Sequence, residues 1–133
     1  MAPSFFGPKE LSFAFIDGNH QHPWPLIDLL HLLPLMRPGS WIVLDDINMP
    51  DLCPGPKVRY GPRYVFEAWP GARLPGFNVG AVQVPADLEE LRPMVVKLLE
   101  IPFEVSQSGL KRYRSQLDTL VEGLWPKATL IRN

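Results

Sequence analysis

The 133-residue sequence has few of the features that are typical of a secreted or membrane protein. It has one cysteine, Cys53, which excludes an internal disulfide and fits a reducing cytosol. Its longest apolar stretch, Leu26 to Met36, is far shorter than the ~20 residues that span a bilayer. The first ten residues contain no apolar segment of the kind found in secretory signals. We therefore expect a soluble, cytoplasmic protein with no membrane partner.

The sequence also lacks an excess of charge of either sign. Its 13 basic and 14 acidic residues give a net charge of −1, so there is no electrostatic case for nucleic acid as a partner. Proline, by contrast, is abundant: 16 residues, more than twice the usual ~5%. The prolines are densest between Pro50 and Pro62, which predicts a long irregular loop. Loops of that length inside a compact domain are often functional.

Two apolar segments, Leu11 to Asp17 and Trp41 to Asp46, read as strands that are joined by a helix from about Trp24 to Met36. A strand, a helix and a second strand with a short return form a βαβ unit, which predicts parallel neighbours with a right-handed crossover. A third strand is expected over Phe77 to Val84. The predicted fold is α/β: one domain over 1–133, with about three mostly parallel strands (about 11–17, 40–46 and 77–84) flanked by helices.

The predicted helix is apolar on almost every side between Leu26 and Met36. A helix of this kind is normally buried all round, which three strands and a few helices would struggle to achieve. We therefore expect a missing partner surface and a homo-oligomer. A non-catalytic oligomerisation or interaction domain is accordingly the alternative to an enzyme. It would bury this helix or an exposed edge of the sheet against a second chain.

Acidic residues end both predicted strands. The carboxyl ends of parallel neighbours point the same way, with ~4.8 Å between strands, so Asp17, Asp45 and Asp46 should converge where open α/β sheets bind ligands. Carboxylate oxygens suit Mg²⁺, or Mn²⁺, which could in turn bind and activate a substrate hydroxyl. His20 could then accept the hydroxyl proton as a catalytic base. The alternative is that the acids cap a turn or helix and that His20 and His22 are solvated or capping side chains.

At these residues the sequence resembles a known family. The stretches FAFIDGNHQH and LLPLMRPGSWIVLDDIN resemble the fourth and fifth strands of class I S-adenosylmethionine-dependent methyltransferases. The resemblance is strongest to metal-dependent O-methyltransferases of the catechol, caffeoyl-coenzyme A and macrocin types. It covers roughly residues 9 to 50, and Phe77 to Val84 loosely. It implies a Rossmann-like fold, S-adenosylmethionine as cofactor and a small-molecule hydroxyl acceptor.

The resemblance also implies roles for particular residues. Asp17 matches the acid that ends the fourth strand in those families, and Asp45-Asp46 match the acidic pair after the fifth, which together hold Mg²⁺. His20 stands where the catechol type has its general-base lysine. Asp17 and Gly18 are the residues that the resemblance places at the cofactor.

The sequence departs from the family before the first predicted strand. The family holds its cofactor mainly through a glycine-rich loop after strand one, and the ten residues before Leu11 contain no such loop. We therefore expect the C-terminal half of a methyltransferase fold without its N-terminal cofactor-binding half. It would be a fragment, the product of a misassigned start or a natural remnant, and inactive as this chain alone.

Overall fold

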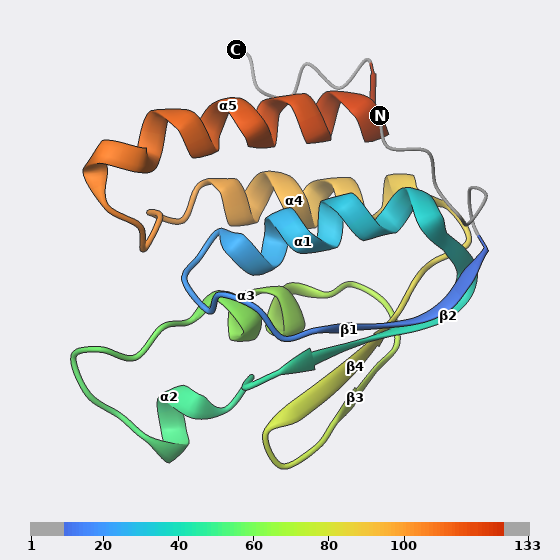
Figure 1. Cartoon of the computed structure of the whole chain (residues 1–133). Coiled ribbons are helices and arrows are strands. Elements are labelled where there is room, and N and C mark those ends of the chain that lie inside the picture. Colours follow the sequence, from blue (N-terminus) through green and yellow to red (C-terminus); the bar gives the residue numbers. More distant parts are fainter. Residues whose placement is uncertain (1–9, 127–133) are drawn as a thin grey trace.

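The computed structural model describes residues 10–126, which form one four-stranded sheet with helices packed against it (Figure 1). The strand order is β1 (Leu11–Ile16), β2 (Met36–Asp45), β4 (Val79–Gln83) and β3 (Arg73–Pro75). The helices are α1 (Trp24–Leu32), α2 (Met49–Leu52), α3 (Gly61–Ala68), α4 (Arg92–Leu99) and α5 (Gln107–Leu124), with short 3₁₀ turns η1 (Leu33–Leu35) and η2 (Leu88–Leu91). No helix within residues 10–126 is long and apolar enough to cross a membrane.

The predicted α/β class is confirmed, and the arrangement is consistent with a partial Rossmann-like methyltransferase fold. The parallel pairing of β1 with β2 is also as predicted. The sheet is not mostly parallel, however, because β4 pairs antiparallel with both β2 and β3. The fourth strand, β3, was not predicted. Only residues 76–78 separate it from β4, and a connection that short can join only antiparallel neighbours.

The start of β2 differs from the prediction in a way that a bulge explains. The second strand was expected to begin at about residue 40, but β2 already begins at Met36. The register with β1 moves from Leu11↔Met36 to Phe13↔Trp41, so extra residues are accommodated on the β2 side. Gly39 lies there with a φ of 84°, in the left-handed region that a glycine adopts without strain.

The apolar face of helix α1 is covered by the chain itself. Its side chains at Leu26, Ile27, Leu29 and Leu30 are each at most 1% exposed. It contacts β1, α3 and α5, and it lies between the sheet and the outer helix α5 (Figure 1). The expectation that this apolar helix needs a partner surface was therefore wrong, because helices distant in sequence fold over it.

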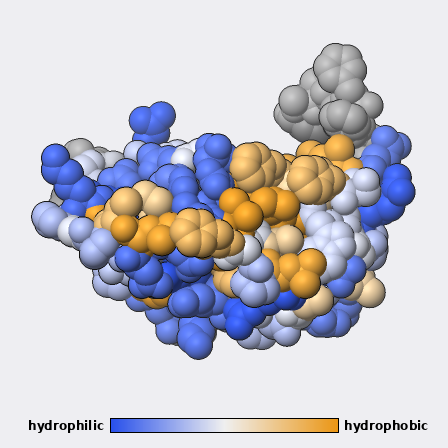
Figure 2. Space-filling view, turned by 90° about the horizontal axis from the view of Figure 1, so that it is seen from below, coloured by the Kyte–Doolittle hydropathy of each residue, from blue (hydrophilic) through white to orange (hydrophobic). Residues whose placement is uncertain are grey.

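Within residues 10–126, the opposite face of the sheet has no comparable cover. Helices α1, α3, α4 and α5 all lie on one side of the sheet (Figure 1). Side chains that alternate to the other side remain accessible: Phe13 and Phe15 of β1 are 60% and 53% exposed, and Leu74 of β3 is 59% exposed. Figure 2 shows apolar side chains gathered on this side of the molecule. We call the surface formed by Phe13, Phe15, Leu74, Phe77 and Val79 the bare sheet face.

Candidate metal site at the strand ends

The carboxyl ends of β1 and β2 lie side by side because Ile16 is in register with Leu44. Asp17 and Asp45 therefore lie opposite each other at the ends of the two strands, and their side chains share a hydrogen bond. This bond, together with desolvation and the charge of Asp45, raises the pKa of Asp17, while His20 opposes the shift. The close approach of the two carboxyl groups favours a proton or a cation at this edge.

Asp46 leaves the strand with an uncommon backbone conformation. Its φ is 62°, in the left-handed region that few residues other than glycine adopt. Its carboxylate pairs with His20, with 2.9 Å between Asp46 Oδ2 and His20 Nε2. Its other oxygen, Oδ1, accepts a hydrogen bond of 2.8 Å from Asn78 Nδ2. Both oxygens of Asp46 are thus fixed in place.

Asp17, His20 and Asp46 form a group that could hold a metal ion. One ligand atom from each residue lies within 4.8 Å of the others. Asp17 is exposed, and the side chains of His20 and Asp46 are 36% and 22% exposed, so water and a substrate can reach the site. Asp45 is not in this group and contacts it through Asp17. The ligand role predicted for Asp17, Asp45 and Asp46 and the base role predicted for His20 stay predictions.

The loop that carries Asp46 is held by residues that were not predicted from the sequence. The side-chain oxygen of Asn78 accepts a hydrogen bond of 2.8 Å from the Asn48 amide, in addition to the bond to Asp46. From α3, Arg63 donates to the Ile47 carbonyl at 3.0 Å and to Asp51 Oδ2 at 2.7 Å. The same hydrogen bond lowers the pKa of Asp51. These partners are distant in sequence, so no local pattern indicates them.

The carboxylate of Glu104 holds the loop that carries His20 in place. Its side chain accepts hydrogen bonds from the amides of His22 at 2.9 Å and Tyr60 at 3.1 Å, and its own amide donates to the His22 carbonyl at 2.7 Å. The amide of Gly61 donates to the His20 carbonyl at 3.0 Å. The His20 loop is therefore tied both to the start of α3 and to the segment before α5.

His22 is a core residue, not the solvated or capping side chain that was the alternative prediction. It is 0% exposed, its Nε2 lies 2.9 Å from the Leu98 carbonyl, and its ring meets those of Tyr64 and Phe103 edge-on. Burial lowers its pKa, so the ring is neutral in the folded protein. Because the buried His22 follows His20 by two residues, it anchors the His20 loop in the core.

Gly18, the second residue predicted to meet the cofactor, lies at the entry of this loop and is exposed. A Cβ atom at this position would meet Asp28 Oδ2 of α1 at 3.3 Å. Burial raises the pKa of Asp28, which is half-buried beneath the loop. The cofactor role of Asp17 and Gly18 is not tested by these contacts and stays a prediction.

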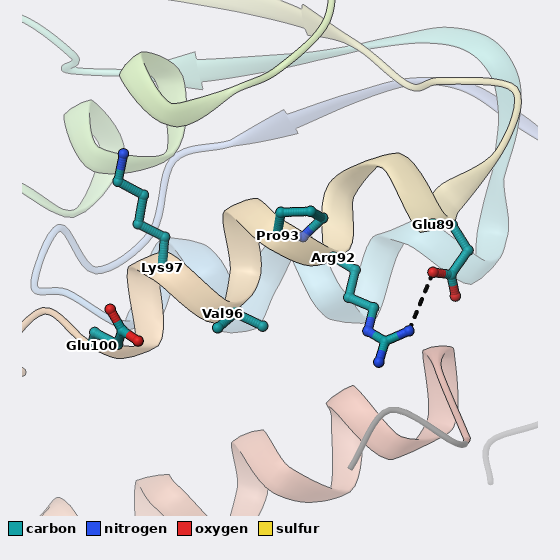
Figure 3. A pocket seen from close by; sticks show the side chains of 6 residues that line it. All are labelled: Glu89, Arg92, Pro93, Val96, Lys97 and Glu100. Carbon is teal, nitrogen blue, oxygen red and sulfur yellow. Dashed lines mark hydrogen bonds and ion pairs between the residues drawn. The ribbon is translucent and has the colours of Figure 1, made fainter. Parts of the chain in front are cut away.

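A pocket of about 440 Å³ opens beside His20. It is lined by His20, by Met49 of α2 and by residues 53–59 of the proline-rich loop. A second hollow of about 530 Å³ runs along the outer side of η2 and α4 (Figure 3). Figure 3 shows its lining side chains on a single helical segment, with the Glu89–Arg92 ion pair of 3.3 Å at one end. It shares no residue with the strand ends, so the first pocket is the one that adjoins the candidate metal site.

The comparison with known families bears on this same segment. Residues 1–47 match the model of a family described as a methyltransferase domain. The match supports a methyltransferase domain, and it includes Asp17, His20, Asp45 and Asp46. It ends before the proline-rich loop and the β3–β4 hairpin. No curated protein and no solved structure matches the chain.

Proposed function

We propose that this chain is an S-adenosylmethionine-dependent O-methyltransferase-like protein that uses a divalent metal, Mg²⁺ or Mn²⁺, to activate the hydroxyl of a small acceptor. The observation that carries the proposal is the meeting of Asp17, His20 and Asp46 within 4.8 Å at the strand ends, inside the segment that matches a methyltransferase family. The acceptor is a small molecule that reaches the site through the adjoining pocket. We place the protein in the cytoplasm, which the single free, exposed Cys53 favours.

The donor set fits a divalent cation. Asp17 and Asp46 offer carboxylate oxygens, which suit both Mg²⁺ and Mn²⁺, whereas an imidazole ligand is better suited to Mn²⁺. A cation would also offset the repulsion between the neighbouring carboxylates of Asp17 and Asp45. When bound, a divalent cation polarises a hydroxyl group and lowers its pKa.

Instead of binding the cation, His20 could act as the base that takes the proton of the acceptor hydroxyl. If its Nε2–H donates to Asp46 Oδ2 across the 2.9 Å contact, the lone pair of Nδ1 is left to accept that proton. Asp46 then orients the ring and stabilises the imidazolium that forms. S-adenosylmethionine, when bound, supplies the methyl group. Within residues 10–126 no glycine-rich loop follows a strand, so only Asp17 and Gly18 are assigned to the cofactor.

The metal site is tested by calorimetric titration of Mg²⁺ and Mn²⁺ into the chain and into Asp46→Asn. We expect saturable binding near one ion per chain, and an affinity about tenfold or more lower in the variant, because an amide carries no charge to balance the cation. Asp118→Asn, which removes an exposed carboxylate on α5, is the matched control and should bind like the parent. Absence of binding in the parent chain, or equal binding by Asp46→Asn, would exclude the metal site.

The bare sheet face favours a second candidate, a non-catalytic domain that associates with a second copy of the chain. Large apolar side chains gather on it, with Phe77 81% and Phe13 60% exposed. In the described residues β1 pairs only with β2, so its outer edge is open to another strand. A homodimer that covers this face would shield both the apolar side chains and the open edge of β1 from water.

The self-association proposal predicts a dimer that dissociates when the bare sheet face is made polar. Sedimentation velocity over a range of concentrations should show the parent chain as a dimer and Phe13→Ser as mostly monomer, because burial of a phenylalanine side chain contributes about 1.5–3 kcal/mol. Val96→Ser on α4, away from the sheet, is the control and should remain dimeric. A monodisperse monomer for the parent at every concentration would contradict the proposal.

A further inference from the structure

We propose that the pocket beside His20 binds an acceptor that carries an anionic group, a carboxylate or a phosphate, held by Lys57 and Arg59. This inference rests on the proposed function, because it names the chemical class of the acceptor for the same site. It assigns the hydroxyl end of the acceptor to His20 and the strand-end carboxylates, and the anionic end to the loop after α2.

The pocket has the size and position for such a ligand. Its volume of about 440 Å³ is within the range of small-molecule sites, ~300–1,000 Å³. His20, which contacts Asp46 at 2.9 Å, is part of its lining. An acceptor in the pocket therefore lies next to the candidate metal site, with its hydroxyl within reach of the groups that would activate it.

The charges of the lining residues are all of one sign. Lys57 and Arg59 both line the pocket, and no acidic residue does. Among the hydrogen bonds and ion pairs of residues 10–126, Arg59 donates only to the Val58 carbonyl, at 3.2 Å, and Lys57 has no acidic partner. Arg63, four residues further on, is by contrast paired with Asp51 at 2.7 Å. Lys57 and Arg59 thus remain available to a ligand.

The two ends of the site select opposite groups. Carboxylates at the strand ends call for a cation, whereas the cationic wall formed by Lys57 and Arg59 favours an anion and disfavours a cationic acceptor. An arginine and a lysine together suit carboxylate and phosphate oxygens, since both donate charge-assisted hydrogen bonds. The acceptor that satisfies both ends is a hydroxylated acid or a hydroxylated phosphate ester.

The test uses the full chain with inorganic phosphate and with benzoate as probes, titrated without divalent metal and followed by backbone amide NMR. We expect at least one anion to bind saturably, with shifts concentrated in residues 53–59, and the tighter probe identifies phosphate or carboxylate as the preferred group. Lys57→Gln/Arg59→Gln should weaken binding of the anion about tenfold or more, because the charge-assisted hydrogen bonds from Lys57 and Arg59 to the anion are lost. Lys111→Gln/Arg112→Gln on α5 removes the same charge elsewhere and should bind like the parent.

Three results would overturn the inference: no binding of either anion, equal binding by the Lys57/Arg59 variant, or an equal loss in the α5 control. Asp46→Asn separates this inference from the proposed function, since it should lose Mg²⁺ binding and keep anion binding. Mg²⁺ binding without anion binding would overturn the acceptor class alone. Anion binding without Mg²⁺ binding would overturn the metal-dependent function and, with it, the role of the anion site in methyl transfer.

Discussion

Gly61→Ala is expected to destabilise the fold by about 1–3 kcal/mol, the usual range for overpacking a filled interior, and to weaken divalent metal binding. Gly61 is buried at the start of α3, and a Cβ atom there would collide with the His20 carbonyl oxygen and lie 2.8 Å from Pro25 Cδ. Both are rigid, because one belongs to the backbone and the other to a ring. The His20 loop must therefore move, which breaks the 3.0 Å hydrogen bond from Gly61 to His20 and shifts the imidazole.

Urea unfolding gives the stability change, and the Mg²⁺ or Mn²⁺ titration gives the change at the site. Gly123→Ala is the matched control: Gly123 is exposed near the end of α5, and a Cβ atom there has nothing within 4 Å. That substitution should leave metal binding unchanged and add up to ~1 kcal/mol of stability, because alanine loses less entropy in a helix. If Gly61→Ala were as stable as the parent with the same metal affinity, the packing of the His20 loop against α3 would not matter to the site.

Acidification from pH 7 to 5.5 is expected to lower the free energy of unfolding through His22. Burial lowers the pKa of His22 below the usual value for histidine, so the unfolded chain binds more protons in this range than the folded one. Stability due to the neutral buried ring is present above the unfolded pKa and is lost as the pH falls below it. The slope from this one group is at most about 1.4 kcal/mol per pH unit.

Urea unfolding at several pH values measures this slope. His22→Phe keeps the aromatic contacts with Tyr64 and Phe103 and removes the titration, so its slope should be smaller than that of the parent even though loss of the contact with the Leu98 carbonyl lowers its stability. His31→Gln removes an exposed histidine and should keep the parental slope. Equal slopes in His22→Phe and the parent would show that His22 does not carry the pH dependence.

Much of the site's arrangement follows from local sequence patterns. The apolar runs that end at Asp17 and Asp45, with a helix between them, predicted neighbouring parallel strands, and β1 and β2 are such neighbours. Parallel neighbours bring their carboxyl ends to one edge, so the proximity of Asp17 to Asp45 was predictable. The pairing of His20 with Asp46 was not, because it depends on the positive φ of Asp46.

The predictions that failed concern surfaces and partners distant in the chain. The apolar helix around Leu26 and Leu30 was expected to need a second chain, but α3 and α5 cover it. Among the described residues, 10–126, the uncovered surface is the far side of the sheet. Periodicity shows how much of a helix is apolar and not what covers it. Likewise, His22 has polar neighbours in sequence and a buried environment in space.

The sequence by itself determined the α/β class, the parallel strand pair and the acids at its ends, because alternation, helix period and turn residues act over a few positions. Only the tertiary structure decided the antiparallel β3–β4 hairpin, the bare sheet face and the supports of the site. Asn78, Arg63 and Glu104 hold the loops that carry Asp46 and His20 through hydrogen bonds between segments far apart in the chain. Such bonds depend on which segments pack together, which local propensities do not encode.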